Sequence, residues 1–503
     1  MKLNLPVLLG LALLLRVAAC SGMDFESLRA LIETQHLRSV ESVLERLAPT
    51  LRYRYALVFS SRSLQGASYR APRAILYGTD ARLVVTFNGD PGQAGYLALE
   101  TLEFDAERHE FLFREILFPP AGEPKAPVQF SASNPPRCQS CHGSVARPIW
   151  DSWPLWPGAY GQRYGMRLSA AERDGLEQFL ARRNSDPRYR HLLGAERFAN
   201  EETFRPTSRS RYSGTVEEPP NAELAALLGD LMNISIAREL EQQRAFSAFR
   251  YALLGLSSEH CGGVAEFLPP GSWRGLREEW RHFADGVERA NALQAATKLR
   301  RLGLQTATEL RSAEAAPPHL LELRFLAEQA LDVKTSWTMA LERGSGEFGA
   351  PSASRSLHDA LLDIVARQDP AVGELAPYET SSDGDRYCSY LQQRSRVALR
   401  NLPVATASST QAQSETPGEH VGNLVEICAS CHEAGVGPVI PFRDAARLRA
   451  ELQTSSAPHG TLLDEVLFRL SVESRAARMP LGIELAEPER SALERYFRTL
   501  AGR

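Results

Sequence analysis

Residues 420–432 read HVGNLVEICASCH, which predicts a helix that runs into two cysteines and a histidine. The same Cys-x-x-Cys-His pattern occurs again as CQSCH at residues 138–142. Chance does not supply two copies in a chain of 503 residues with 7 cysteines and 11 histidines. Cysteines three residues apart lie on one turn of a helix, with the histidine beside them. Each motif therefore predicts a site built from two thiols and an imidazole.

Three kinds of site use such a motif: covalent haem c, a thioredoxin-like redox pair, or half of a zinc site. A redox pair normally opens a helix after a strand in a βαβ unit, and we expect no such unit around either motif. A zinc site needs two further ligands, for which the C-terminal segment offers only His420 or His459. We therefore predict two haem c groups. The predicted thioether residues are Cys138, Cys141, Cys428 and Cys431, and the predicted iron ligands are His142 and His432.

Residues 420–503 resemble a class I cytochrome c domain. The resemblance rests on the helix into CASCH, the following loop EAGVGPVIPF, the pair Met479-Pro480, and a final helix with Tyr496 and Phe497. It implies a small all-α fold in which His432 is the proximal iron ligand and Met479 the distal one, with a carbonyl near Pro438 accepting the ring N–H of His432. A thioether ligand favours ferrous iron, and a filled coordination sphere leaves no position for a substrate. The resemblance thus implies outer-sphere electron transfer.

The first motif departs from that pattern, because no Met-Pro pair follows it. Met166 precedes an expected capped helix just as Met479 precedes the final helix, which makes Met166 the leading candidate for the sixth iron ligand. An iron whose sixth coordination position is occupied by a protein ligand would pass electrons, whereas an iron with that position open would bind peroxide or another small ligand. An open position is one alternative, and the other candidate ligands are Tyr160, Tyr164, His109 and His191. Three tryptophans are expected to pack around the haem edge: Trp150, Trp153 and Trp156.

The first 22 residues read as an export leader, with Lys2 followed by an apolar run that is too short to span a bilayer. The sequence Val17-Ala18-Ala19-Cys20 resembles the lipobox of bacterial lipoproteins, which implies cleavage before Cys20 and acylation of its thiol. A plain signal peptide with an incidental cysteine is the alternative. The residue after the cysteine is Ser21 rather than an aspartate, and the same resemblance then implies an anchor in the outer membrane. We therefore expect a lipid-anchored protein on the periplasmic side of the bacterial envelope, and two or more acyl chains would hold it there durably.

The composition excludes several classes of protein. Hydrophobic residues make up 43% and charged residues 23% of the chain, which excludes collagen-like, coiled-coil and wholly disordered structures. The 57 basic residues are outnumbered by 61 acidic ones, which leaves a net charge of −4. No whole-chain basic field exists to attract nucleic acid, and we expect no nucleic-acid partner.

Local patterns predict the elements of an α+β fold. Apolar residues at helical spacing predict helix within 24–47, and short β-rich runs between turn residues predict an antiparallel meander of four or five strands over 53–118. Ser169 and Glu172 predict a capping box that opens a helix at 168–183. Two further helical stripes are Leu224, Leu227, Leu228 and Leu231, and Leu357, Leu361, Ile364 and Val365.

The expected organisation is an α+β multidomain protein, in which a β-meander domain leads to the first haem site. The parts in chain order are a lipoprotein signal peptide (1–19), an α+β domain with the first haem site (20–205), a helical middle domain (222–400), a linker of small polar residues (402–419) and a small all-α cytochrome c-like domain (420–503). Two cysteines lie outside the motifs. Cys261 and Cys388 either form a disulfide in an oxidising compartment or remain buried thiols, and His260 is expected to be a surface or packed histidine.

Three functions are compatible with these features. The first is a di-haem electron-transfer lipoprotein that exchanges single electrons with redox partner proteins. The second resembles the bacterial di-haem cytochrome c peroxidases, in which one haem feeds electrons to another with an open face. The third is a sensor or scaffold in which haem is structural or gates ligand binding. We favour the first, because the helical middle separates the two motifs by 290 residues and the first motif follows a β-rich segment rather than a recognisable cytochrome fold.

Overall fold

The computed structural model of the chain contains both helices and an antiparallel sheet, which confirms the α+β class. The chain forms two compact units, one of Met1–Pro135 with Gly158–Phe204 and one of Pro136–Pro157 with Arg205–Arg503. The structure describes residues 23–61, 63–120, 122–123, 126–142, 145–150, 158–161, 168–200, 203–204, 219–258, 261–270, 272, 277, 280–281, 284, 318–331, 333, 356–376, 381–400, 419–432, 440–456, 460–471, 485 and 487–502. The leader and nearly all of the predicted linker lie outside these residues.

A seven-stranded antiparallel sheet is the centre of the first unit, with the order β6-β5-β4-β3-β2-β1-β7. Its first five strands pair in chain order, which confirms the predicted meander. Turn chemistry fixes the longest hairpin, because the side chain of Asp105 accepts hydrogen bonds from the backbone amides of Glu107 and Arg108 at 2.9 and 3.0 Å. The strands are β1 (Tyr55–Val58), β2 (Arg73–Tyr77), β3 (Leu83–Phe87), β4 (Ala98–Asp105), β5 (Glu110–Leu117), β6 (Gln129–Phe130) and β7 (Ala159–Tyr160).

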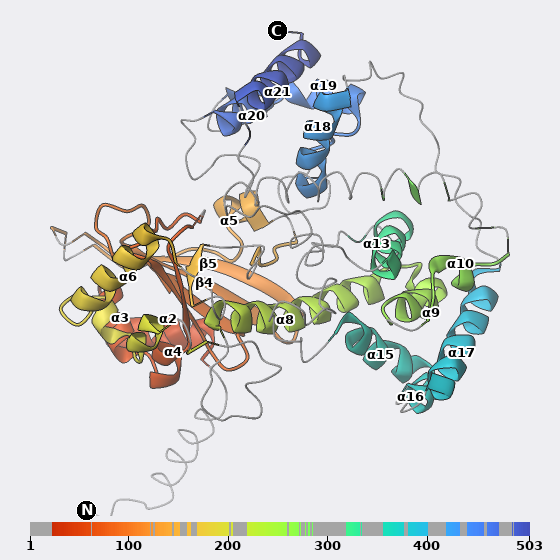
Figure 1. The fold of residues 1–503 in the computed structure, drawn as a ribbon, viewed down its shortest axis with the longest axis horizontal. Helices are drawn as coiled ribbons and strands as arrows, with labels where there is room; N and C mark the ends of the chain where they lie inside the picture. Colours follow the sequence, from red (N-terminus) through yellow and green to blue (C-terminus); the bar gives the residue numbers. More distant parts are fainter. Residues whose placement is uncertain are drawn as a thin grey trace, which may run out of the picture. The chain divides into compact units, whose positions relative to one another are not determined.

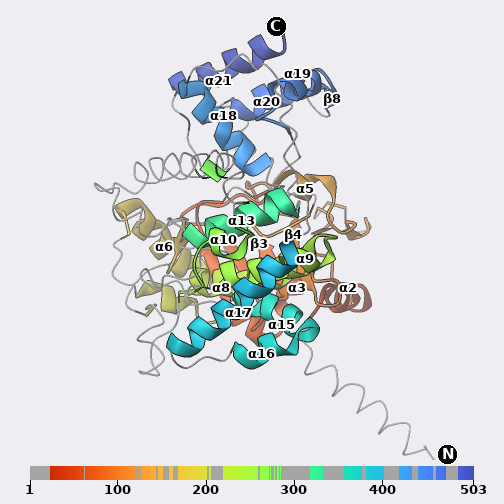
Figure 2. The same cartoon turned by 90° about the vertical axis from the view of Figure 1, so that its right-hand side faces the viewer.

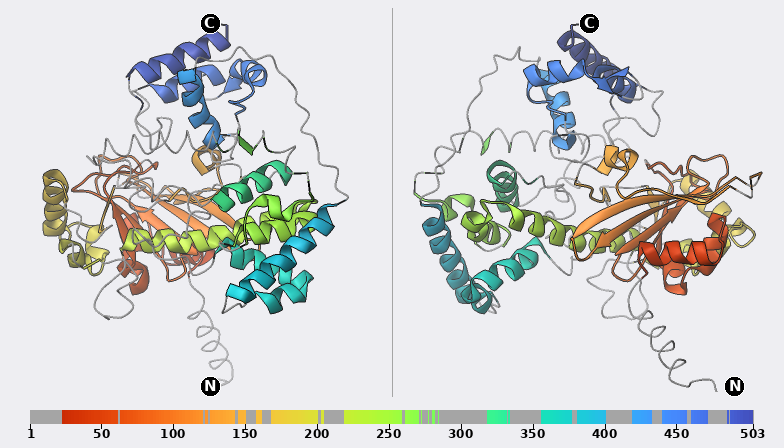
Figure 3. Two further views of the ribbon diagram at one scale, coloured as in Figure 1. Left: turned by 45° about the vertical axis from the view of Figure 1, so that its right-hand side comes forward. Right: turned by 180° about the vertical axis from the view of Figure 1, so that it is seen from behind.

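One face of this sheet is covered by the N-terminal helices α2 (Phe25–Thr34) and α3 (Val40–Arg46), as Figure 3 shows. The predicted helical stretch at 24–47 is therefore two helices rather than one. His36 takes a left-handed conformation with φ 53°, and Ser39 then opens a new capping box. The shared core comprises Phe25, Leu28, Ile32, Val40, Val43 and Leu44 from the helices and Leu57, Leu76, Val85, Leu99 and Ile116 from the strands.

Helix α6 (Ala170–Arg182) confirms the predicted capping box. The Ser169 hydroxyl accepts a hydrogen bond from the amide of Glu172 at 3.3 Å, and the Glu172 carboxylate accepts one from the amide of Ser169 at 2.7 Å. Three short helical segments complete the first unit: α4 (Pro49–Tyr53), η1 (Tyr189–His191) and η2 (Ala195–Ala199).

A buried guanidinium ties distant segments of the first unit together. Arg188 is 1% exposed, and its Nε donates to Glu41 at 2.6 Å while an Nη donates to the carbonyl of Asn88 at 2.7 Å. Its charge also lies 3.4 Å from the ring centre of Tyr96. Burial opposes ionisation of Glu41, but the hydrogen bond and charge of Arg188 together hold the pKa of this carboxyl below its ordinary value. No sequence pattern indicated this contact.

The second unit is helical through its middle, and the two predicted stripes lie on helices α8 and α15 (Figure 1). In α8, Leu224, Leu228 and Leu231 are buried and Leu227 is partly buried, while all four residues of the α15 stripe are buried. Helix α5, which carries the first motif, also belongs to this unit, whereas the predicted boundaries group it with the β-meander. The helices are α5 (Pro136–His142), α8 (Pro220–Gln242), α9 (Phe246–Leu256), α10 (Val264–Phe267), α13 (Pro318–Ala330), α15 (Leu357–Gln368), α16 (Pro370–Leu375) and α17 (Ser381–Leu399).

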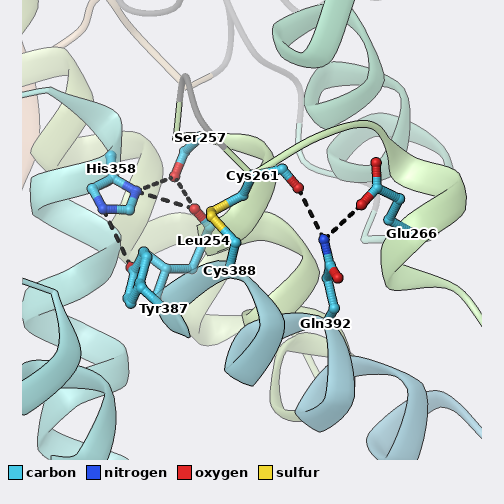
Figure 4. Close-up of a disulfide and its surroundings, with 8 residues drawn as sticks. All are labelled: Leu254, Ser257, Cys261, Glu266, His358, Tyr387, Cys388 and Gln392. Carbon is cyan, nitrogen blue, oxygen red and sulfur yellow. Dashed lines mark hydrogen bonds between the residues drawn. A yellow bond between two sulfur atoms is a disulfide. The ribbon is translucent and has the colours of Figure 1, made fainter. Parts of the chain in front are cut away.

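A disulfide joins Cys261, next to α10, to Cys388 on α17, which resolves the two alternatives for these cysteines (Figure 4). The bridge spans a sequence separation of 127 residues and is buried, with the two cysteines 2% and 7% exposed. A side chain beside it reinforces the junction: Gln392 donates to the carbonyl of Cys261 at 3.2 Å and to Glu266 at 2.7 Å. The bridge therefore crosslinks two segments of the helical region that are far apart in the chain.

The C-terminal segment has its own core, and its helices group together in Figures 1 and 2. The first and last helices, α18 and α21, are in contact. Leu424, Phe442, Leu448 and Phe497 are among the buried residues of this cluster. The elements are α18 (Glu419–His432), α19 (Ala445–Leu452), β8 (Ser455–Ser456), β9 (Gly460–Thr461), α20 (Leu462–Leu470) and α21 (Glu487–Leu500). In the described part of the chain, no helix combines the length and apolar content needed to cross a membrane.

The disulfide makes a testable contribution to stability. Replacing Cys261 and Cys388 together by serine should lower the free energy of unfolding by about 2–4 kcal/mol, because the closed loop no longer restricts the unfolded chain. Urea unfolding followed by circular dichroism measures this loss. As a check on the bridge itself, alkylation of the unfolded wild-type protein without reductant should leave both cysteines unmodified; modification of both would contradict the assignment.

Candidate functional site

The first motif occupies the short helix α5, which begins at Pro136 and ends at His142. Proline suits the first turn of a helix, since its fixed φ is helical and its missing N–H would have no partner there. Positions 138, 141 and 142 are related by i, i+3 and i+4, so they share one face of the helix. The side chains of Cys138 and His142 are partly buried, and that of Cys141 lies outside the described side chains. The helix thus gathers two cysteine positions and one histidine.

The protonation of His142 follows from one contact. Its Nδ1 lies 2.7 Å from the backbone carbonyl oxygen of Arg147. A carbonyl oxygen only accepts hydrogen bonds, so Nδ1 carries the proton and donates it. In the neutral ring Nε2 then keeps its lone pair, which is the form that binds a metal ion. The amide of Arg147 donates back to the carbonyl of His142 at 3.1 Å, so the two residues are joined through both backbone and ring.

The segment after α5 is anchored to helix α8. The side chain of Arg147 is 3% exposed and forms an ion pair with Glu239 of α8. Burial lowers the pKa of the Arg147 guanidinium, and the charge of Glu239 opposes that shift. Trp150, one of the three predicted tryptophans, has its indole nitrogen 3.5 Å from the carbonyl of Asn221 at the start of α8. Arg147 and Glu239 are 92 residues apart, and no sequence pattern pointed to this pair.

Two apolar side chains next to the first motif remain exposed. Val145 is 48% exposed and Ile149 is 43% exposed, while the three residues between them are buried. Single exposed aliphatic side chains are ordinary on a protein surface and do not by themselves indicate a ligand. Two cysteine positions and one imidazole are the donor set that a haem c would use.

The second motif ends helix α18, and positions 428, 431 and 432 share one helical face in the same way as in α5. The Cys428 sulfur is 3.7 Å from the carbonyl of Leu424 one turn earlier. The ring of His432 meets Phe442 edge-on, with ring centres 5.3 Å apart, and Phe442 in turn meets Phe497 of α21 at 5.9 Å. An aromatic series therefore connects the motif to the final helix. Phe497 was singled out in the sequence, whereas the bridging role of Phe442 was not.

Several predicted residues lie outside the part of the chain that the structure describes. They include both methionine candidates and the loop that was expected to supply a carbonyl to His432. The residues are Cys20, Trp153, Trp156, Tyr164, Met166, His260, Pro438, His459 and Met479, and the side chains of Cys141, His420 and Cys431. Among the described side chains, no three His, Cys, Asp or Glu residues gather as a metal-binding group.

The other candidates for the sixth ligand have partners within the first unit. The buried hydroxyl of Tyr160 faces the carbonyls of Tyr69 and Glu172 at 2.8 and 3.0 Å, and burial raises its pKa. His109 occupies the β4–β5 turn with φ 60° and packs edge-on against Phe104. His191 accepts a hydrogen bond from Arg190 at 3.3 Å, and burial, aided by the charge of Arg190, lowers its pKa. Each is thus accounted for as part of the fold.

Tyr160 can be tested as a structural residue. Replacing Tyr160 by phenylalanine removes the hydroxyl that bonds the carbonyls of Tyr69 and Glu172, which should cost about 0.5–1.5 kcal/mol in urea unfolding. The absorption spectrum of the haem-loaded protein should not change. Tyr69→Phe is the matched control, because this side chain is 41% exposed and its loss of a hydroxyl should cost little. A spectral change in Tyr160→Phe alone would restore Tyr160 as an iron ligand.

Comparisons with known proteins found no matching protein-family model, no matching curated protein and no matching solved structure. The assignment of this site therefore depends on the residues and geometry of this chain.

Proposed function

We propose that the protein is a c-type cytochrome that holds two covalent haems and transfers single electrons on the periplasmic side of a bacterial membrane. The hydrogen bond from His142 Nδ1 to the carbonyl of Arg147 carries this proposal. It gives the histidine at the end of a Cys-x-x-Cys helix the tautomer in which Nε2 can bind a metal ion. A thiol redox pair has no need of that arrangement, since its chemistry resides in the two sulfurs.

The residues have separate tasks in this proposal. Cys138 and Cys141 would hold one porphyrin through thioether bonds, and Cys428 and Cys431 the other. His142 and His432 would bind the two irons from the same helical faces. Haem c, when bound, supplies a one-electron iron centre whose potential depends on its axial ligands. Phe442 orients His432 by edge-on contact, and Arg147 orients His142 through its carbonyl.

The C-terminal segment supports a cytochrome c domain as the second haem carrier. Its helices bury a separate apolar cluster, and the motif-bearing α18 contacts the final helix α21. A contact between the motif helix and the final helix agrees with the resemblance to class I cytochrome c, whereas the short paired strands β8 and β9 depart from the all-α fold that it implies. Met479 is the proposed second protein ligand of the second haem iron. It would leave that iron no open coordination position and would raise its reduction potential.

The cell envelope is the proposed location. A buried disulfide persists in an oxidising compartment, which agrees with an export leader at residues 1–19 and acylation of Cys20. The protein would then be anchored by lipid at the periplasmic side, in the outer membrane, and exchange electrons with redox partner proteins. One envelope-bound chain would then contain the β-meander domain, the helical domain and the cytochrome domain.

Removal of one motif tests the haem assignment. Replacing Cys138 and Cys141 by serine should remove about half of the covalent haem absorbance, because one of two attachment sites is lost. The Cys428→Ser/Cys431→Ser variant should lose the other half. Cys261→Ser/Cys388→Ser is the matched control, since it removes as many cysteines but should retain both haems. Full haem absorbance in either motif variant would contradict the proposal.

Ligand binding separates electron transfer from peroxidase chemistry. We expect both haems to be six-coordinate and low-spin, so carbon monoxide and peroxide should leave the spectra of the ferrous and ferric protein unchanged. Met479→Ala should make only the second haem accessible to carbon monoxide, and Met166→Ala only the first. A wild-type protein with a high-spin haem that binds carbon monoxide would instead favour the peroxidase-like alternative.

A further inference from the structure

The carbonyl that contacts His142 belongs to a residue whose side chain is fixed elsewhere. Arg147 meets His142 twice, through its amide and its carbonyl, and its guanidinium pairs with Glu239 on helix α8. The ion pair thus links the residue that supplies this carbonyl to helix α8.

This ion pair is costly as a simple stabiliser. Arg147 is 3% and Glu239 22% exposed, so both charges have lost much of their hydration. Well-packed apolar residues often stabilise a protein as much as a buried ion pair does. An ion pair does, however, fix the direction of a planar guanidinium, since the carboxylate accepts only along its N–H bonds. Positional accuracy is thus what this pair provides.

The accuracy matters because of what the carbonyl does to the ring. An acceptor at Nδ1–H makes the imidazole more basic, and Nε2 becomes a stronger electron donor. A stronger donor stabilises ferric iron more than ferrous iron, which lowers a reduction potential. Loss of the acceptor should have the opposite effect.

We propose that Arg147 and Glu239 are positioning residues for the first haem, which lower its reduction potential by holding the Arg147 carbonyl against His142 Nδ1–H. This inference rests on the proposed function, because it assumes that His142 binds haem iron. It assigns a redox role to helix α8, which carries no part of the motif.

Substitutions of opposite charge separate positioning from electrostatics. Glu239→Gln removes a negative charge and Arg147→Met removes a positive one. A through-space effect would shift the potential in opposite directions, upward for Glu239→Gln and downward for Arg147→Met. Positioning predicts an upward shift in both, because both release the carbonyl. If the preference of the site for ferric over ferrous iron falls tenfold, the one-electron reduction potential rises by about 59 mV. We expect a shift of this size.

The measurement is a redox titration of the full-length protein with both haems attached. The first haem is the component that disappears in Cys138→Ser/Cys141→Ser. Glu328→Gln is the matched control, because the Arg324–Glu328 pair is also buried, at 7% and 9% exposed, but lies on α13. It should shift neither haem. Glu239→Asp retains the charge and should keep the potential close to that of the wild type. If Arg147→Met does not fold, Arg147→Lys replaces it: lysine keeps the charge but lacks the planar guanidinium, so positioning predicts an upward shift and a through-space effect predicts none.

The outcomes distinguish this inference from the proposed function. If the wild-type protein carries no haem at the first motif, the proposed function fails, and this inference fails with it. If both haems are present and the first potential is unchanged, or moves in opposite directions in Glu239→Gln and Arg147→Met, only the positioning role is overturned. An upward shift in both variants, with none in Glu328→Gln, supports it.

Discussion

A backbone carbonyl cannot donate a hydrogen bond, and this constraint fixes the tautomer of the histidine in the first motif. Because the carbonyl of Arg147 accepts from His142 Nδ1, Nε2 is left as a lone-pair donor. Two cysteine positions stand on the same helical face. The short helix α5 therefore carries two cysteine positions and an imidazole whose Nε2 keeps its lone pair, which is the arrangement that the proposed haem attachment uses.

The two motifs use the same helical geometry with different surroundings. His142 is oriented by a polar contact whose source is held by a buried ion pair. His432 packs edge-on against Phe442, within an aromatic series that ends on helix α21. The carbonyl contact raises the basicity of the His142 ring, and the ring contact orients His432.

Much of the fold could be predicted from local sequence patterns. The strands β1–β5 follow from β-rich runs between turn residues, and α6 from the Ser169–Glu172 capping box. Strands β6 and β7 have two residues each and pair with β5 and β1, and two residues are too few to show the alternation that predicts a strand. Arg188 bonds to Glu41, which is 147 positions away in the sequence, and Arg147 pairs with Glu239, which is 92 positions away. Local periodicity carries no information on such pairs, so both were missed, whereas the motifs themselves could be recognised directly.

The proposed function requires covalent attachment of haem at both motifs. The decisive measurement is the mass of the proteolytic peptides that contain residues 138–142 and 428–432, from protein matured in a bacterium that ligates haem c. Each peptide should carry the added mass of one haem. Peptides of unmodified mass, with all four motif cysteines present as thiols or disulfides, would contradict it.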